Sequence, residues 1–290
     1  KEGSRSYLEE GEATITGGSG NDYIRVEYYE TVNVEGGEGN DTFYIRDIKG
    51  EVKVNAGNGN DNVGYSWDRV RSIEGDVEVD LGEGDDTFWS DHTKSKLVVK
   101  GEQGKDNING YYGLKVEIEG GTDNDTLSFE NFLAGTLSGG TGDDQLTATY
   151  SAEPWSLSRA RDKNSNNIYD ETQVYVLDGG EGDDTLKIRG NYTWLEYGGN
   201  EANLKGGEGD DTIEITDNNA GKTSGTEGNQ YGIVKAVIEG GEGKDKITVS
   251  GGLDISITTG ADSDTVALTA HQFRTLKEGP RIVKNDDGSS

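Results

Sequence analysis

The chain has 290 residues, of which 56 are acidic and 27 are basic, so its formal net charge is −29. This charge argues against nucleic acid or an anionic membrane as a partner. The chain has no cysteine, which excludes disulfides and thiolate metal sites. Only 30% of the residues are apolar and 46 are glycine, a composition that favours disorder unless the sequence repeats.

The sequence does repeat. A six-residue, glycine-rich turn that ends in aspartate occurs eleven times, and two copies share the run Gly-Gly-Glu-Gly-Asp-Asp-Thr. The first places of the turns are Gly17, Gly36, Ala56, Leu81, Gly101, Gly120, Gly139, Gly179, Gly206, Gly240 and Thr259. The sixth places are Asp22, Asp41, Asp61, Asp86, Asp106, Asp125, Asp144, Asp184, Asp211, Asp245 and Asp264. Most copies start 19 or 20 residues apart, which sets the length of one coil.

Apolar residues flank every turn with the period of a β-strand. Each copy has one two positions after the aspartate, from Ile24 to Val266, and another two positions before the turn, from Ile15 to Ile257. The residue directly before the turn is always polar, so the chain alternates between inward and outward positions on both sides. Each coil is therefore predicted to be strand, acidic turn, strand and second turn.

Stacked coils would bury the apolar positions as ladders between two parallel sheets. We therefore expect an all-β fold, a right-handed parallel β-roll or β-helix solenoid with two strands per coil. Residues 17–270 form the predicted solenoid, preceded by a cap and first strand at 1–16 and followed by a cap or linker at 271–290. Since the chain starts at Lys1 and has no methionine, we expect it to be an excerpt or a processed product with flanking domains.

The additional residues of the long repeats all fall between the two strands of a coil, opposite the acidic turns. They occupy segments near 65–71, 150–173, 190–200 and 217–231. Aromatic residues are frequent after the first strand of the coils, and we expect them to cap the core, with stacking on sugars as the alternative. They are Tyr28, Tyr29, Trp67, Trp89, Tyr111, Tyr112, Tyr192, Trp194 and Tyr197, with Trp155 in the longest insertion. The segment that begins at Asp162 has part of the spacing of an EF-hand loop, so a polar loop, an additional calcium site and a degenerate coil over 161–178 all stay open.

The pattern Gly-Gly-x-Gly-x-Asp-x-apolar-x resembles the calcium-binding repeat of the repeats-in-toxin (RTX, hemolysin-type) family, over about residues 17 to 268. The resemblance implies calcium ions between stacked turns, held by main-chain carbonyls and by the eleven sixth-place aspartates. Calcium also suits the chemistry, because it accepts six to eight oxygen ligands in adaptable geometry. The neighbouring acids Asp85, Asp143, Asp183 and Asp210 are candidates for additional charge or a second contact.

The chain departs from the family pattern, because the motif occurs once per coil rather than about every nine residues. We therefore expect a single row of ions along one edge. Three turns deviate, through Glu102 at a second place and through Asp123 and Asp262 at fourth places. Eleven turns enclose at most ten ions, whose 20 positive charges would bring the net charge from −29 to −9. Calcium binding and folding should therefore be coupled.

The sequence predicts a calcium-binding structural module of a larger bacterial protein that is secreted or displayed on the cell surface. The resemblance implies type I secretion and folding outside the cell, where calcium is abundant. The first alternative is an adhesin-type domain that binds carbohydrate or a host-cell surface through the aromatic loops. A polysaccharide-modifying β-helix enzyme is less favoured, because neither His92 nor His271 lies near a recognisable nucleophile. No apolar run is long enough to insert in a membrane.

Overall fold

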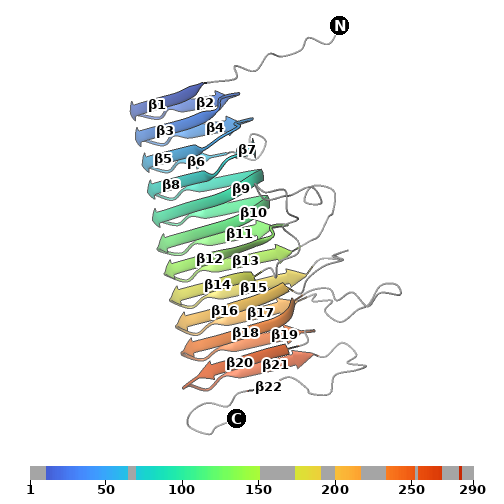
Figure 1. Ribbon diagram of the computed structural model, residues 1–290. Coiled ribbons are helices and arrows are strands. Elements are labelled where there is room, and N and C mark those ends of the chain that lie inside the picture. Colours follow the sequence, from blue (N-terminus) through green and yellow to red (C-terminus); the bar gives the residue numbers. More distant parts are fainter. Residues whose placement is uncertain are drawn as a thin grey trace, which may run out of the picture.

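The protein is a parallel β-solenoid. The computed structural model describes residues 11–64, 70–150, 174–190, 200–216, 233–251, 254–269 and 281–282. These residues form one hydrogen-bonded sheet of 22 strands, and all the strand pairings are parallel. The coils stack in sequence order from the blue end to the red end (Figure 1). The expected all-β solenoid with two strands per coil is confirmed.

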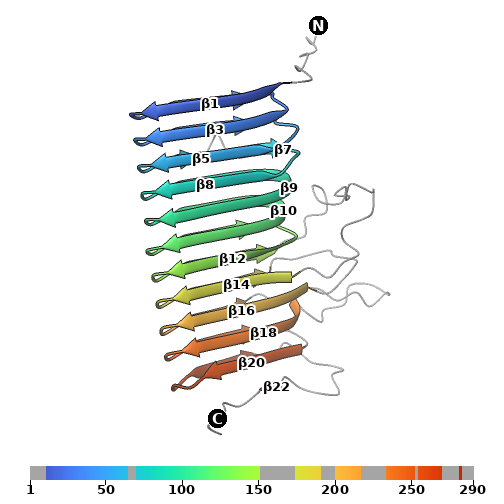
Figure 2. The same cartoon turned by 60° about the vertical axis from the view of Figure 1, so that its left-hand side comes forward.

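One face of the solenoid carries the strands that lead into the glycine turns (Figure 2). They are β1 (Glu12–Ser19), β3 (Thr31–Glu38), β5 (Val52–Asn58), β8 (Val77–Glu83), β12 (Ala134–Thr141), β14 (Val174–Glu181), β16 (Asn200–Glu208), β18 (Ile233–Glu242) and β20 (Asp254–Gly260). The short β22 (Arg281–Ile282) pairs with β20.

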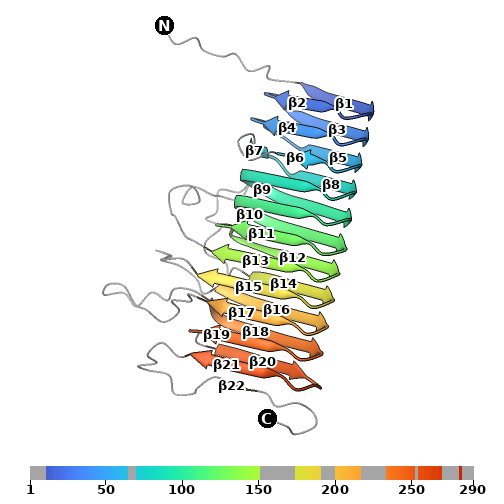
Figure 3. The ribbon, with the colours of Figure 1, turned by 180° about the vertical axis from the view of Figure 1, so that it is seen from behind.

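The other face carries the strands that follow the turns (Figure 3). They are β2 (Tyr23–Glu27), β4 (Thr42–Arg46), β6 (Asn62–Val63), β7 (Val70–Ile73), β11 (Thr126–Glu130), β13 (Gln145–Tyr150), β15 (Thr185–Gly190), β17 (Thr212–Thr216), β19 (Lys246–Ser250) and β21 (Thr265–Thr269).

Two long strands join the faces. β9 (Thr87–Gln103) and β10 (Asn107–Thr122) run from one face to the other without a break, with a register shift between Gly113 and Lys115. The sequence predicted two separate sheets with a second turn in every coil. In these two coils a continuous strand takes the place of that turn, so the hydrogen bonding is that of a single sheet.

The glycine turns all lie at one edge, on the left in Figure 1 and on the right in Figure 3. Strand pairing continues through the second and third places of the turn, as in Gly18 with Gly37 and Ser19 with Glu38. The glycines at the second and fourth places have positive φ, for example 115° at Gly180 and 128° at Gly182. A Cβ on Gly182 would lie 2.1 Å from the carbonyl oxygen of Gly142, so only glycine permits this close stacking.

The two predicted apolar ladders form the core. Every residue of both ladders in the nine inner coils is buried, from Phe43 to Ile247 after the turns and from Val34 to Ile238 before them. In the two end coils, Ile15 and Val266 are only partly buried, because no further coil covers them there. Side chains of neighbouring coils also match each other in size: a Cβ on Gly110 would lie 1.9 Å from the ring of Phe129 in the next coil, so the ring requires glycine there.

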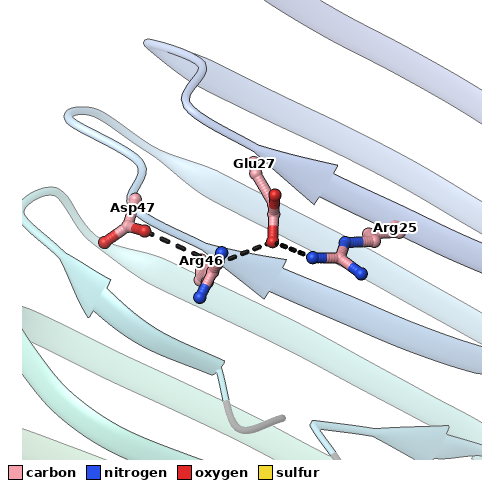
Figure 4. Close-up of polar contacts among 4 residues, drawn as sticks. All are labelled: Arg25, Glu27, Arg46 and Asp47. Carbon is pink, nitrogen blue, oxygen red and sulfur yellow. Dashed lines mark hydrogen bonds and ion pairs between the residues drawn. The ribbon is translucent and has the colours of Figure 1, made fainter. Parts of the chain in front are cut away.

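The opposite edge differs from coil to coil. In the first two coils Glu27 lies between two arginines, with its Oε1 2.7 Å from Arg25 Nη2 and 2.6 Å from Arg46 Nε (Figure 4). Further along, Asp76 Oδ1 accepts a hydrogen bond from Ser95 Oγ and another, at 3.1 Å, from the main-chain nitrogen of Lys96. The predicted insertions lie outside the described residues, apart from a few flanking positions, as do most of the predicted caps.

Candidate metal-binding edge

The eleven sixth-place aspartates form a single column at the end of the turns. The main-chain nitrogen of each aspartate donates a hydrogen bond to Oδ1 of the aspartate in the following coil, over ten steps at 2.7–3.0 Å. The steps span 19 to 40 residues of sequence, yet their geometry is the same. Insertions at the other edge therefore leave the column undisturbed.

This hydrogen-bond ladder fixes the second carboxylate oxygen in the interior of the turn. The Oδ2 atoms of all eleven aspartates are buried, and no donor in the described structure reaches them. Nine of the side chains are 0–2% exposed, and only Asp22 and Asp264 in the end coils are half-buried. Burying a charged oxygen without a partner is costly, so a whole column of such atoms suits a neutralising cation.

Burial raises the pKa of the inner carboxyl groups, although the main-chain hydrogen bond to Oδ1 offsets part of this effect. The raised values are about 8 for Asp106, about 7 for Asp86, Asp125, Asp144, Asp184 and Asp211, and about 6 for Asp61 and Asp245. Neighbouring carboxylates in the column raise several of these pKa values further. Near neutral pH the column therefore favours either protons or metal ions as neutralising partners.

The fifth-place residues form a second ladder on the outside of the turns. Its hydrogen bonds run in the opposite direction: the main-chain nitrogen of Asp183 donates to Asp143 Oδ1 of the preceding coil at 3.0 Å, and that of Asp210 donates to Asp183 Oδ1 at 2.8 Å. Asn40 and Asn60 accept in the same way in the first coils. The acids Asp85, Asp143, Asp183 and Asp210 are exposed, so they add surface charge beside the column.

The donor chemistry of the edge fits calcium. The described residues contain no group of three or more His, Cys, Asp or Glu side chains placed to hold a metal. A metal in the column must therefore take main-chain carbonyl oxygens as well as carboxylates, which is a ligand set that calcium prefers. The two kinds of oxygen do converge: a Cβ built on Gly179 would lie 2.2 Å from Asp184 Oδ2 and 2.6 Å from the carbonyl oxygen of Gly206.

The three deviating turns adopt the glycine geometry to different extents. Glu102 and Asp123 have positive φ values of 75° and 76°, so these side chains accept a conformation that normally favours glycine. At the last turn, Asp262 instead accepts a hydrogen bond from the main-chain nitrogen of Gly243 through Oδ2 at 3.2 Å. In other turns that nitrogen position donates to a main-chain carbonyl, as Gly209 does to Glu242.

The fold and the edge together define a class of protein, a parallel β-solenoid that presents a column of buried carboxylate oxygens. A family profile described as RTX calcium-binding nonapeptide repeat (4 copies) matches residues 10–26, 33–44, 134–149, 176–187 and 197–214. The matched turns are similar to RTX calcium-binding repeats, as their resemblance implied, and multiple repeats of this kind take multiple calcium ions as their cofactor. Neither a curated protein nor a solved structure matches the chain.

Other predicted features fall in two groups. The EF-hand-like segment, Trp155, Trp194 and His271 lie outside the described residues. His92 lies at the corner of the opposite edge, where its Nδ1 is 2.5 Å from Asp91 Oδ1 and its ring is 4.6 Å from that of Tyr112. No helix in the described chain is long and apolar enough to span a membrane.

Two arrangements were missed by the sequence reasoning. The direction of the two hydrogen-bond ladders carries no signal in the sequence. The pairing of Glu27 with Arg46 does, because both residues are five positions after their aspartates and neighbouring strands are in register. An acid and a base at the same place of successive coils predict such an ion pair.

Proposed function

We propose that this chain is a calcium-stabilised structural module of a larger secreted or cell-surface bacterial protein. In this proposal the ions lie in one row along the turn edge, no more than one between successive turns. The sixth-place aspartates supply the carboxylate ligands, and the turns supply carbonyl oxygens. The observation that carries the proposal is the column of eleven buried Oδ2 atoms that no donor reaches.

Each aspartate has two tasks in this arrangement. Its Oδ1 accepts the main-chain N–H of the preceding coil and so fixes the carboxylate, as between Asp144 and Asp184 at 2.8 Å. Its Oδ2 is thereby directed into the turn, where burial keeps competing water away. Calcium supplies positive charge to a chain whose formal charge is −29. Neutralising the column removes both the mutual repulsion and the cost of burying unpaired carboxylates.

The dependence on calcium supports an extracellular location in this proposal. The narrow apolar core of one solenoid coil provides limited stability, and the acidic column opposes folding until it is neutralised. A chain of this kind stays unfolded where calcium is scarce and folds where it is abundant. That behaviour suits a segment exported through a narrow channel before it folds. Carbohydrate binding by the aromatic residues of the other edge stays a prediction, because Trp67, Trp155, Tyr192, Trp194 and Tyr197 lie outside the described residues.

Circular dichroism tests the proposal. We expect the strand signal to be lost in excess chelator and to return when calcium is added, because the column cannot be buried while charged and unneutralised. Magnesium at the same concentration should restore less of the signal, since it requires stricter octahedral geometry. A strand signal that is the same in chelator and in calcium would contradict the proposal.

A further inference from the structure

The first place of the turn is glycine in eight coils, although the backbone does not require glycine there. The positive φ values belong to the second and fourth places, as at Gly180 and Gly182, and Gly179 at the first place has none. Moreover, Ala56, Leu81 and Thr259 occupy the same place in three coils. Glycine at the first place must therefore serve to keep the position of a Cβ free for the close approach of neighbouring atoms, rather than to permit a conformation.

Two oxygens converge on that space in each of the eight coils. A Cβ built on the first-place glycine would lie 2.1–2.7 Å from Oδ2 of the aspartate in its own turn. It would also lie 2.2–2.6 Å from the carbonyl oxygen of the first-place residue in the next coil. Because a Cβ cannot lie so close to oxygen, only glycine lets the two oxygens converge on one region, as two ligands of one calcium ion must. At Gly36 the ring of Phe43 also lies 2.7 Å from the built Cβ.

In the third and fourth coils a side chain occupies this space. Ala56 and Leu81 are both 0% exposed and belong to the apolar core. The hydrogen-bond ladder nevertheless continues through these coils, from Asp61 to Asp86 at 2.7 Å and from Asp86 to Asp106 at 2.9 Å. These two coils therefore keep the fold of the turn, with Oδ2 of Asp61 and of Asp86 buried and reached by no donor as elsewhere in the column, but a Cβ at the first place keeps Oδ2 and the next carbonyl oxygen from converging.

We propose that the calcium row is interrupted at the third and fourth coils, which leaves eight ion sites in two blocks. The first block follows the turns at Gly17 and Gly36, and the second follows the six turns from Gly101 to Gly240. Between the two blocks, the third and fourth coils, with Ala56 and Leu81 at the first place of the turn, are stabilised by apolar packing instead of calcium. This inference rests on the proposed function and lowers the expected number of bound calcium ions from at most ten to eight.

Calcium stoichiometry of the folded protein, measured by isothermal titration and by elemental analysis after gel filtration, tests the inference. The wild-type chain should bind eight ions. Ala56→Gly should bind nine, because it removes a single methyl group and opens one space. Gly179→Ala should bind seven, because its Cβ pushes Asp184 Oδ2 and the carbonyl oxygen of Gly206 apart, while the φ of residue 179 itself does not require glycine. The double variant Ala56→Gly/Leu81→Gly should bind ten.

A control separates the space from the loss of packing. Leu97→Ala removes a buried side chain from the same face, away from the turns, and should still bind eight ions although it lowers stability. A wild-type chain that binds ten ions, or an Ala56→Gly variant that gains none, would overturn the interruption alone. A wild-type chain that binds no calcium would instead overturn the proposed function.

Discussion

At both edges of the solenoid the chain passes from one face to the other, but the side chains that stabilise this passage differ between the two edges. At the turn edge, every coil repeats one arrangement, in which an aspartate is fixed by Oδ1 and its Oδ2 is buried. At the opposite edge, the described coils share no such arrangement. One coil uses the ion pairs of Glu27, another the hydrogen bonds to Asp76, and a third the packing of Phe132 with Tyr175 at 5.1 Å between ring centroids.

The difference shows what a shared arrangement does for a repeat protein. One hydrogen-bonded arrangement that fits every coil allows one sequence motif to serve eleven times, so the aspartate column is the same in every coil. The opposite edge closes each coil with that coil's own side chains, so it varies freely and accepts insertions. Acids at the two edges accordingly have opposite pKa shifts, raised at Asp106 and lowered at Asp76.

The largest expected effect is that, without calcium, the folded state becomes more stable as the pH falls from neutral, which is the reverse of ordinary acid denaturation. Folding raises the pKa of the column to about 6–8, so its contribution to stability is present below the unfolded pKa and is lost as the pH rises through that range. The strand signal in chelator should therefore increase on acidification from neutral pH. Circular dichroism at graded pH measures this.

Acids outside the column limit that gain. The pKa of Asp76 is lowered by its hydrogen bond from Ser95, so its contribution is present at neutral pH and is lost as the pH falls through its folded pKa. An Asp76→Asn variant should leave the gain on acidification intact, which serves as the control. A calcium-free chain that loses strand signal steadily from neutral to acid pH would contradict the comparison of the edges.

The next largest effect is expected at a single aspartate, where one substitution should raise stability without calcium and lower it with calcium. Asp184→Asn keeps an oxygen that can accept the N–H of Asp144 but removes the charge, so it should stabilise the calcium-free chain and weaken calcium binding. Asp184→Ala also leaves that N–H unsatisfied, at a cost of about 1–3 kcal/mol in both conditions. Thermal unfolding with calcium and with chelator measures both variants.

The pair of Asp184 variants distinguishes charge from hydrogen bonding. If Asp184→Asn loses stability equally in calcium and in chelator, the buried charge is not what calcium neutralises at this coil.

The smallest effect is expected at the opposite edge. Glu27→Gln weakens the contacts to Arg25 and Arg46 on a partly exposed surface, so it should cost about 1 kcal/mol or less, more at low salt than at high salt. Calcium affinity should stay unchanged, because this site lies at the far edge from the column. Calcium titration of the variant beside the wild type checks this, and a shifted affinity would show that the two edges are coupled.

The sequence predicts the turn edge and the core well, because both depend on strict spacing. The apolar positions flanking Asp144 and Asp184 are inward in every coil for the same reason, which is strand alternation in register. The continuous strands β9 and β10 are not predicted, since no residue marks the coils in which the second turn is replaced. The orientation of Oδ2 is not predicted either, because it follows from contacts between coils that lie 19 to 40 residues apart.

The fit of Phe129 over Gly110 has a consequence for the history and engineering of this chain. Repeats that share a turn are often regarded as interchangeable blocks, to be copied or deleted at will. Deleting the 19 residues from 107 to 125 would preserve the spacing of the turns, yet it would bring Phe129 opposite Ser90, which is fully buried and leaves no space for the ring. The coil of Phe129 therefore requires the coil of Gly110 as its neighbour, so at this point the side chains of the core fix the order of the coils.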